Sequence, residues 1–174
     1  MRTTRTVSDE TEIRRLIDVY FHAVDARDHE RMRSIYTHDA EFTGLARPDG
    51  TGGHTHSGID AVVALLDGTK SFAASCHSGS NTVIDVDGDT ATADTFAVAF
   101  VLPKGEGSVR VRGLRYRDRL VRVEGGGWLI RGRVHCPLWQ YDTPATALAL
   151  PGAAELTMAT ATATATAAPA DADR

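Results

Sequence analysis

The spacing of apolar residues changes once along this 174-residue chain, near residue 70, and that change limits the folds it can adopt. Before it, apolar residues recur every three or four positions, the period of a helix packed on one face. After it, they alternate with polar residues, the period of a half-buried strand. A chain whose helices precede its strands is expected to fold as an α+β domain, with the helices covering one face of a curled antiparallel sheet.

Three helices are expected in the first part. The first spans about residues 9 to 26, because Ser8 can cap its start and helical spacing is kept by Ile13, Leu16, Ile17, Tyr20 and Val24. A shorter helix follows Asp28, and a third lies within residues 58 to 68. The segment 44–58 holds five glycines and a proline, so we expect a mobile loop and a candidate lid there.

Four strand-like segments follow, at residues 78–89, 90–102, 108–127 and 128–140. Each boundary carries a turn signal: the pair Asp87-Gly88, then Pro103 with two nearby glycines, then three consecutive glycines. Short turns between consecutive strands favour an antiparallel meander. A strongly curled sheet closed by helices encloses a pocket, which is the first place to look for a ligand site.

The composition argues against a nucleic-acid-binding protein. The net charge is -4, from 23 acidic and 19 basic residues, and no dense cluster of lysine and arginine occurs. The arginines of segment 112–122 are interrupted by Asp118, a spacing typical of the polar face of a strand. Cys76 and Cys136 stand in no metal-binding or redox spacing, and we expect them to be buried free thiols.

The chain is expected to form one domain, since 174 residues suffice for one well-packed core. We expect a flexible start over residues 1–7, the folded domain over 8–142, and an Ala/Thr/Pro-rich, mostly disordered tail over 143–174. No apolar run approaches the roughly 20 residues that cross a bilayer, and the first residues lack the pattern of a signal segment. A cytoplasmic protein without a membrane partner is therefore expected.

The segment 76–81, CHSGSN, places a histidine four residues before an asparagine at the entry to a strand. Because side chains alternate along a strand, His77 and Asn81 are expected on one face and Cys76 on the other. His77 is then either a general base, with an ordinary pKa near 6.5, or a hydrogen-bonded structural residue. The sequence alone leaves both possibilities open.

Three further residues have the chemistry to work beside such a base. Asp25 ends the first helix, where the helix dipole disfavours an acid, so it is either a surface or capping residue or has a partner in a pocket. Tyr20 lies on the apolar stripe of that helix and is either core or a hydroxyl facing a cavity. Arg133, on the last strand, is either exposed or placed to stabilise an anion.

Several segments together resemble one protein family. They are LIDVYFHAVDARDHERMRSIYTHDAEF (16–42), HSGSNTVIDVDGDTATA (77–93), RYRDRLVRVEGGGWLIRGR (115–133) and the closing Trp139. In this order they resemble the SnoaL-like branch of the nuclear transport factor 2-like superfamily. The resemblance implies a cone-shaped α+β fold, in which a curved antiparallel sheet wraps around the N-terminal helices.

The resemblance also implies a chemistry. In members such as bile acid 7α-dehydratase, scytalone dehydratase and hexachlorocyclohexane dehydrochlorinase, an aspartate and a histidine act together on a proton next to a leaving group. By this resemblance Asp25 orients His77, His77 removes the proton, and Tyr20 and Arg133 assist the leaving group. A dehydratase-type elimination without cofactor is expected; isomerisation, cyclisation, epoxide opening and non-catalytic binding stay open.

The expected substrate is a small hydrophobic molecule of polyketide, steroid or aromatic type. Expected aromatic lining residues are Phe21, Phe42, Phe96, Phe100 and Trp139, and expected polar ones are Asn81, Asp94, Tyr116 and His135. His54 and His56 resemble a metal pair, but without a third ligand no metal site is expected. The resemblance further implies a homo-oligomer, either a dimer or a trimer.

Overall fold

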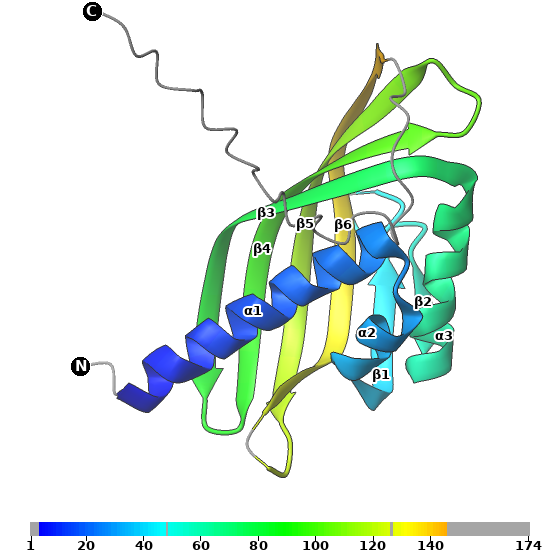
Figure 1. Cartoon of the computed structure of the whole chain (residues 1–174). Helices are drawn as coiled ribbons and strands as arrows, with labels where there is room; N and C mark the ends of the chain where they lie inside the picture. The colour runs from blue at the N-terminus through cyan, green and yellow to red at the C-terminus, as the bar shows by residue number, and fades with distance from the viewer. Residues whose placement is uncertain (1–3, 48, 126, 146–174) are drawn as a thin grey trace, which may run out of the picture.

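The computed structural model describes residues 4–47, 49–125 and 127–145 (Figure 1). Its helices are α1 (Thr4–Ala26), α2 (His29–Ser34), α3 (Ile59–Ala64) and the 3₁₀-helix η1 (Leu65–Ser71). Its strands are β1 (Tyr36–Gly44), β2 (His54–Ser57), β3 (Phe72–Asp87), β4 (Thr90–Pro103), β5 (Ser108–Arg122) and β6 (Trp128–Pro144). None of the described helices is long and apolar enough to cross a bilayer.

The strands form one curled sheet in the order β2-β1-β6-β5-β4-β3. Strands β3 to β6 pair antiparallel in chain order, which confirms the predicted meander and the α+β class. The expectation of a wholly antiparallel sheet was wrong at one edge, because β1 pairs in parallel with β6 and antiparallel with β2. Neither β1 nor β2 was predicted, since β1 carries few apolar residues and β2 lies within the glycine-rich segment.

Several predicted boundaries need correction. Helix α1 begins at Thr4, so residues 4–7 are helical rather than a flexible start. Strand β3 begins at Phe72, several residues before CHSGSN, which places His77 within the strand rather than at its entry. Strand β6 continues to Pro144, past the expected domain end at residue 142. The predicted disorder of the remaining tail falls on residues 146–174, outside the described part.

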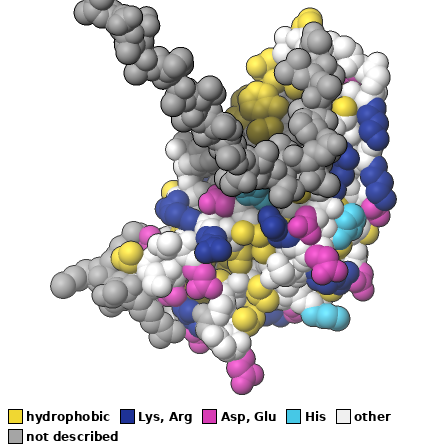
Figure 2. All heavy atoms as spheres, viewed as in Figure 1, with side chains coloured by type: hydrophobic (Ala, Val, Ile, Leu, Met, Phe, Trp, Pro, Cys, Tyr) yellow, Lys and Arg dark blue, Asp and Glu magenta, His cyan; other side chains and the backbone are white. Residues whose placement is uncertain are grey.

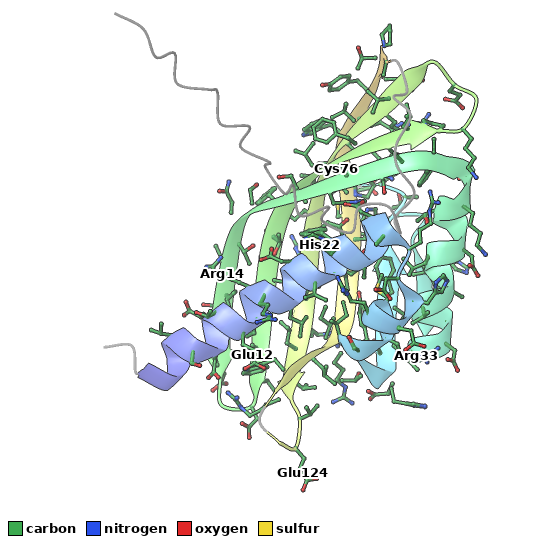
Figure 3. The ribbon with its side chains drawn as sticks, in the orientation of Figure 1. Glu12, Arg14, His22, Arg33, Cys76 and Glu124 are labelled. Carbon is green, nitrogen blue, oxygen red and sulfur yellow. The ribbon has the colours of Figure 1, made fainter. Side chains whose placement is uncertain are left out.

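Helix α1 lies across one face of the sheet, here called the inner face (Figure 1). It buries Ile13, Leu16, Ile17, Tyr20 and Phe21 against that face. The opposite side of α1 carries exposed residues such as Arg14 and His22 (Figure 3). Acidic and basic side chains are interspersed over this view of the surface (Figure 2). The amphipathic spacing of the first helix therefore sets which side meets the sheet.

Strand β4 shows how the sheet divides into two faces. Its inner face carries small or medium residues, namely Ala91, Ala93, Thr95, Ala97, Ala99 and Val101, all of them buried. Its outer face carries Asp94, Phe96 and Phe100, which are partly or largely exposed. Cys76 on β3 pairs with Phe100 and is exposed (Figure 3), so the expectation of a buried thiol was wrong there. Cys136 is half-buried.

An ion pair between β5 and β6 is sealed under α1. Both Asp118 and Arg133 have no exposed side-chain surface, and Arg133 Nε and Nη2 each donate to an Asp118 oxygen at 2.6 Å. The Arg133 guanidinium also lies 3.8 Å from the centre of the Tyr20 ring. Two charges removed from water require such close, bidentate geometry to offset their lost hydration.

We predict that Asp118→Asn destabilises the protein by about 3–5 kcal/mol, because it leaves the Arg133 charge buried without a counter-charge. Urea denaturation followed by circular dichroism measures this loss. The control Asp142→Asn breaks the exposed pair with Arg110 and should cost less than about 1 kcal/mol. Equal losses for the two variants would contradict the prediction.

Candidate active site

A cavity of about 270 Å³ lies between the helices and the inner face of the sheet. Its walls are mostly apolar and aromatic, with a few polar groups: Tyr20, Val24, Met32, Tyr36, Phe42, Val62, Leu65, Leu66, Thr69, His77, Arg112, Tyr116 and His135. A second hollow of about 130 Å³ shares Val24, Thr69, His77, Arg112 and His135 with the cavity. The two spaces therefore adjoin around these shared residues.

His77 and Asp25 meet at the wall of this cavity. His77 Nδ1 lies 2.7 Å from Asp25 Oδ1, and the His77 backbone N–H donates to Asp25 Oδ2 at 2.8 Å. The Ser75 hydroxyl donates to Asp25 Oδ1 at 2.7 Å. Because an ionised carboxylate can only accept, the proton of the His77 ring lies on Nδ1 and leaves Nε2 as an acceptor. The structure thus brings together the two residues paired by the sequence.

Asp25 remains ionised in this setting. Burial opposes its charge, yet the hydrogen bonds from His77 and Ser75 outweigh burial and hold the pKa of this carboxyl below its ordinary value. The partners on β3 also compensate for the unfavourable helix dipole at the end of α1.

The ring of Phe21 packs against one face of the His77 ring. The two rings stack with centroids 5.9 Å apart and an angle of 12° between their planes. Gly79 makes this possible, because a Cβ at that position would lie 2.5 Å from Phe21 Cε2. Phe21 is therefore a support for His77 and, contrary to expectation, not part of the cavity lining.

Three buried tyrosines, Tyr20, Tyr36 and Tyr116, line the same cavity. Burial raises the pKa of all three phenols, and the nearby charge of Arg133 opposes that rise only in part. Their hydroxyls therefore stay protonated at neutral pH and can donate hydrogen bonds. Within the described structure, the Tyr36 hydroxyl is buried without a hydrogen-bond partner, which leaves it free to meet a bound molecule.

Arg133 does not line this cavity, so the expectation of direct contact with a leaving group is not supported. Asp118 engages two of its nitrogens, and its guanidinium packs beneath the ring of Tyr20. The alternative of an exposed strand arginine is also wrong, since Arg133 is 1% exposed. Its charge nevertheless acts on the cavity residues, because it lowers the pKa of the three tyrosines and of His135.

His135 and Phe42 were correctly placed in the cavity. The centres of their rings lie 6.3 Å apart, and the centre of the Tyr116 ring lies 5.3 Å from that of His135. Burial, followed by the charge of Arg112, lowers the pKa of His135 from 6.5 to about 4. His135 is therefore neutral near pH 7 and can donate or accept a hydrogen bond.

Arg112 is the cavity residue that the sequence analysis missed, because it was assigned to the polar face of a strand. Arg117 and Arg119 do lie exposed on that face. Arg112 instead points to the inner face and lines both hollows. The available signal was its spacing of four from Tyr116, which puts both side chains on one face of β5.

Four predicted lining residues lie outside the cavity, on the outer face. Asp94 is bound by Arg115, and Phe96, Phe100 and Trp139 are 42%, 42% and 51% exposed. They border no part of the inner cavity; Asp94 and Phe96 instead line a groove of about 600 Å³ on the outer face. The physical reason is that β4 turns its alanines, not its phenylalanines, toward the helices.

Asn81 was also misplaced by the sequence. A bulge interrupts the pairing of β3 with β4 between Ser80 and Val83, and Asn81 has a left-handed backbone with φ of 48°. The simple alternation that links positions 77, 79 and 81 therefore fails at its last member. Asn81 is exposed and lies away from the cavity that His77 lines.

Among the described residues, no group of three or more His, Cys, Asp or Glu side chains is arranged to hold a metal ion. His54 and His56 lie together on β2, with ring centroids 5.4 Å apart. The expectation of a mobile polar loop was wrong for these two residues, because they lie on the exposed edge strand of the sheet. The titratable groups that line the cavity are imidazole, phenol and guanidinium groups, and the Asp25 carboxylate reaches it through His77.

The fold has clear counterparts among known proteins. Residues 5–134 match the profile of a family described as SnoaL-like domain. A type 2 hexachlorocyclohexane dehydrochlorinase is similar in structure, with a TM-score of 0.70, 20% identity, and coverage of 84% of this chain and 96% of that one. Among curated proteins, none matches this chain.

Two structures from Novosphingobium aromaticivorans are also similar. One, a proposed scytalone dehydratase, has a TM-score of 0.68 and 21% identity, and the match covers 83% of this chain and 96% of that chain. The other, a nuclear transport factor 2-like protein with a cystatin-like fold, has a TM-score of 0.64 and 27% identity, with coverage of 77% and 84%.

We predict that stability falls as the pH falls from about 7 to about 4, partly because of His135. In this range the unfolded chain takes up a proton at His135, whereas the folded protein with its lowered pKa does not. The lowered pKa of His135 corresponds to a loss in the free energy of unfolding on the order of 3 kcal/mol. Thermal denaturation at several pH values should show a flatter profile for His135→Gln and an unchanged one for the exposed control His54→Gln. Identical profiles for wild type and His135→Gln would refute the assignment.

Proposed function

Because this chain belongs to the SnoaL-like domain family of the nuclear transport factor 2-like superfamily, we propose that it is a cofactor-independent lyase that performs a dehydratase-type elimination. The observation that carries the proposal is the 2.7 Å contact between His77 Nδ1 and Asp25 Oδ1 at the wall of an apolar cavity. Its similarity in fold to a dehydrochlorinase and a proposed dehydratase supports the reaction class.

His77 is the general base in this proposal. Its Nε2 accepts a proton from the carbon next to the one that bears the hydroxyl group. The electron pair of the C–H bond forms the new C=C bond, and the C–O bond breaks with its electron pair on oxygen. Asp25 holds the ring tautomer and stabilises the imidazolium that forms. A positioned base of this kind contributes about 10²–10⁴-fold to the rate.

Tyr20 is the proposed acid for the departing oxygen. It lines the same cavity as His77, and burial keeps its hydroxyl protonated. The hydroxyl group leaves as water with the proton of Tyr20, and the imidazolium then returns one proton to the phenolate. The guanidinium of Arg133 lies 3.8 Å from the centre of the Tyr20 ring, so its charge stabilises the transient phenolate of Tyr20. Arg133 is therefore a positioning residue rather than a catalytic one.

The cavity supports a small substrate. Ligand pockets commonly measure about 300–1,000 Å³, and the main cavity, at about 270 Å³, lies below that range before the adjoining hollow is included. Its walls from α2, α3 and η1 are aliphatic, including Met32, Val62 and Leu66. These features fit a single aromatic ring or a short polyketide better than a four-ring steroid.

Isomerisation is the second candidate, because the same dyad can return the abstracted proton to a different carbon. A screen of small hydroxy-carbonyl compounds, followed by mass spectrometry, separates the possibilities. Loss of one water supports elimination, unchanged mass with altered chromatography supports isomerisation or cyclisation, and gain of one water indicates epoxide opening. If no compound in a broad panel is converted, the site is one of binding only.

We predict that His77→Ala lowers kcat by about 10²–10⁴-fold on a substrate found in that screen, because it removes the base. Asp25→Asn should lower kcat as well, since an amide neither fixes the tautomer nor stabilises the imidazolium. The control His29→Ala alters an exposed histidine that contacts Asp67 and should leave kcat unchanged. Full turnover by both His77→Ala and Asp25→Asn would end the dyad proposal.

The outer face of the sheet is proposed to contact a second copy of the chain. Phe96, Phe100, Trp139 and Tyr141 are each at least 42% exposed on β4 and β6. Trp139 and Tyr141 stack on one another, and Arg115 packs over Phe96. Several exposed aromatic side chains on one sheet are typical of a protein interface.

We predict that Phe100→Lys weakens self-association, because it places a charge within this aromatic group. Sedimentation velocity over a range of concentrations should shift the variant toward the monomer relative to wild type. The control Val7→Lys alters an exposed apolar residue on α1 and should leave the distribution unchanged. A wild-type protein that stays monomeric at high concentration would contradict the proposed interface.

A further inference from the structure

Arg112 carries a positive charge into the cavity without a counter-charge. In the described structure its Nε is buried and has no hydrogen-bond partner. Burial lowers the pKa of its guanidinium, and the neighbouring charge of Arg110 adds to that effect. The groups that face it are Tyr116 and the two histidines His77 and His135, which share its cavities. None of these supplies a negative charge at neutral pH.

Three carboxylates on elements around the cavity are already engaged. Asp118 is bound by Arg133 through two hydrogen bonds, and Asp25 accepts three from His77 and Ser75. Asp142 is bound by Arg110. A guanidinium cannot lose its proton to escape burial, so an uncompensated arginine is costly unless a ligand supplies the missing charge.

The register of the sheet places Arg112 opposite the proposed base. His77 pairs with Ala99, and Ala99 pairs with Arg112, so the three residues form one row across β3, β4 and β5. Two strand spacings separate the outer members by about 10 Å at their Cα atoms. The residue between them is an alanine, whose single methyl group leaves the space above it open to a bound molecule.

We propose that Arg112 binds a carboxylate of the substrate, so that the substrates of this site are hydrophobic carboxylic acids. The inference rests on the cavity of the proposed function and adds a substrate class to it. One end of the molecule is held by charge-assisted hydrogen bonds from Arg112. Its hydrocarbon body then extends over Ala99, with the reacting C–H bond at His77 Nε2. Dehydration of a 3-hydroxy acid to an unsaturated acid fits this arrangement.

Binding of cinnamate and cinnamamide tests the proposal, because the two probes share one shape, whereas the end group is an anionic acceptor in the first and a neutral amide in the second. Isothermal titration calorimetry at pH 7.5 should show that the full-length protein binds cinnamate about 10–100-fold more tightly than cinnamamide. Arg112→Gln should abolish this preference, and Arg112→Lys should keep part of it. The control Arg117→Gln removes an exposed arginine of the same strand and should leave the preference intact.

Two further measurements separate binding from folding and from catalysis. The melting temperature of Arg112→Gln without ligand should equal or exceed that of wild type, because a costly buried charge is removed. A large drop in melting temperature would instead assign Arg112 a structural role. His77→Ala should keep the preference for cinnamate while losing turnover. Binding of the carboxylate and the elimination reaction are therefore tested by separate measurements. Equal affinity of wild type for the two probes, or an unchanged preference in Arg112→Gln, overturns the proposal.

Discussion

The ion pair between Asp118 and Arg133 is the interaction on which the arrangement of the site depends. It joins β5 to β6 under α1, where neither side chain reaches solvent. The guanidinium in turn lies against the ring of Tyr20 and so fixes one face of α1 over the sheet. Asp25 lies five residues further along the same helix, about 7.5 Å along its axis. Anchoring Tyr20 over β6 therefore helps to hold Asp25 against β3, where it meets His77.

The second constraint is the pattern of side-chain size on the inner face of β4. Alanines at positions 91, 93, 97 and 99 are buried but small. Between the helices and this strand they leave open volume that phenylalanines would fill. The His77 ring and the Arg112 guanidinium both project from neighbouring strands toward that volume. The smaller hollow, which Ala99 and Val101 line, is thus a consequence of which face of β4 is turned inward.

The sequence predicted the helices, the meander and the His77–Asp25 contact, because these depend on local periodicity and on a matched pattern. The prediction from the sequence failed where either face of one strand could have been turned toward the helices. Strand β4 carries large apolar residues on one face and alanines on the other, and hydrophobicity alone favoured the phenylalanines as the inner side. Asn81 was misplaced because a single bulge reverses the alternation beyond it. Strands β1 and β2 carry too few apolar residues to be recognised without their neighbours.

Arg133 and Arg112 lie on adjoining strands and differ in whether a carboxylate of the described chain neutralises their charge. Arg133 has a carboxylate partner that accepts from its Nε and from one of its terminal nitrogens, which gives the buried charge the close counter-charge that a structural arginine requires. Arg112 has no such partner within the described chain, yet it is held half-buried beside His135, where its charge also depresses the pKa of that imidazole. Stability alone does not account for a cation kept in this state. A site that sacrifices stability for function does, because the missing counter-charge then arrives with the substrate.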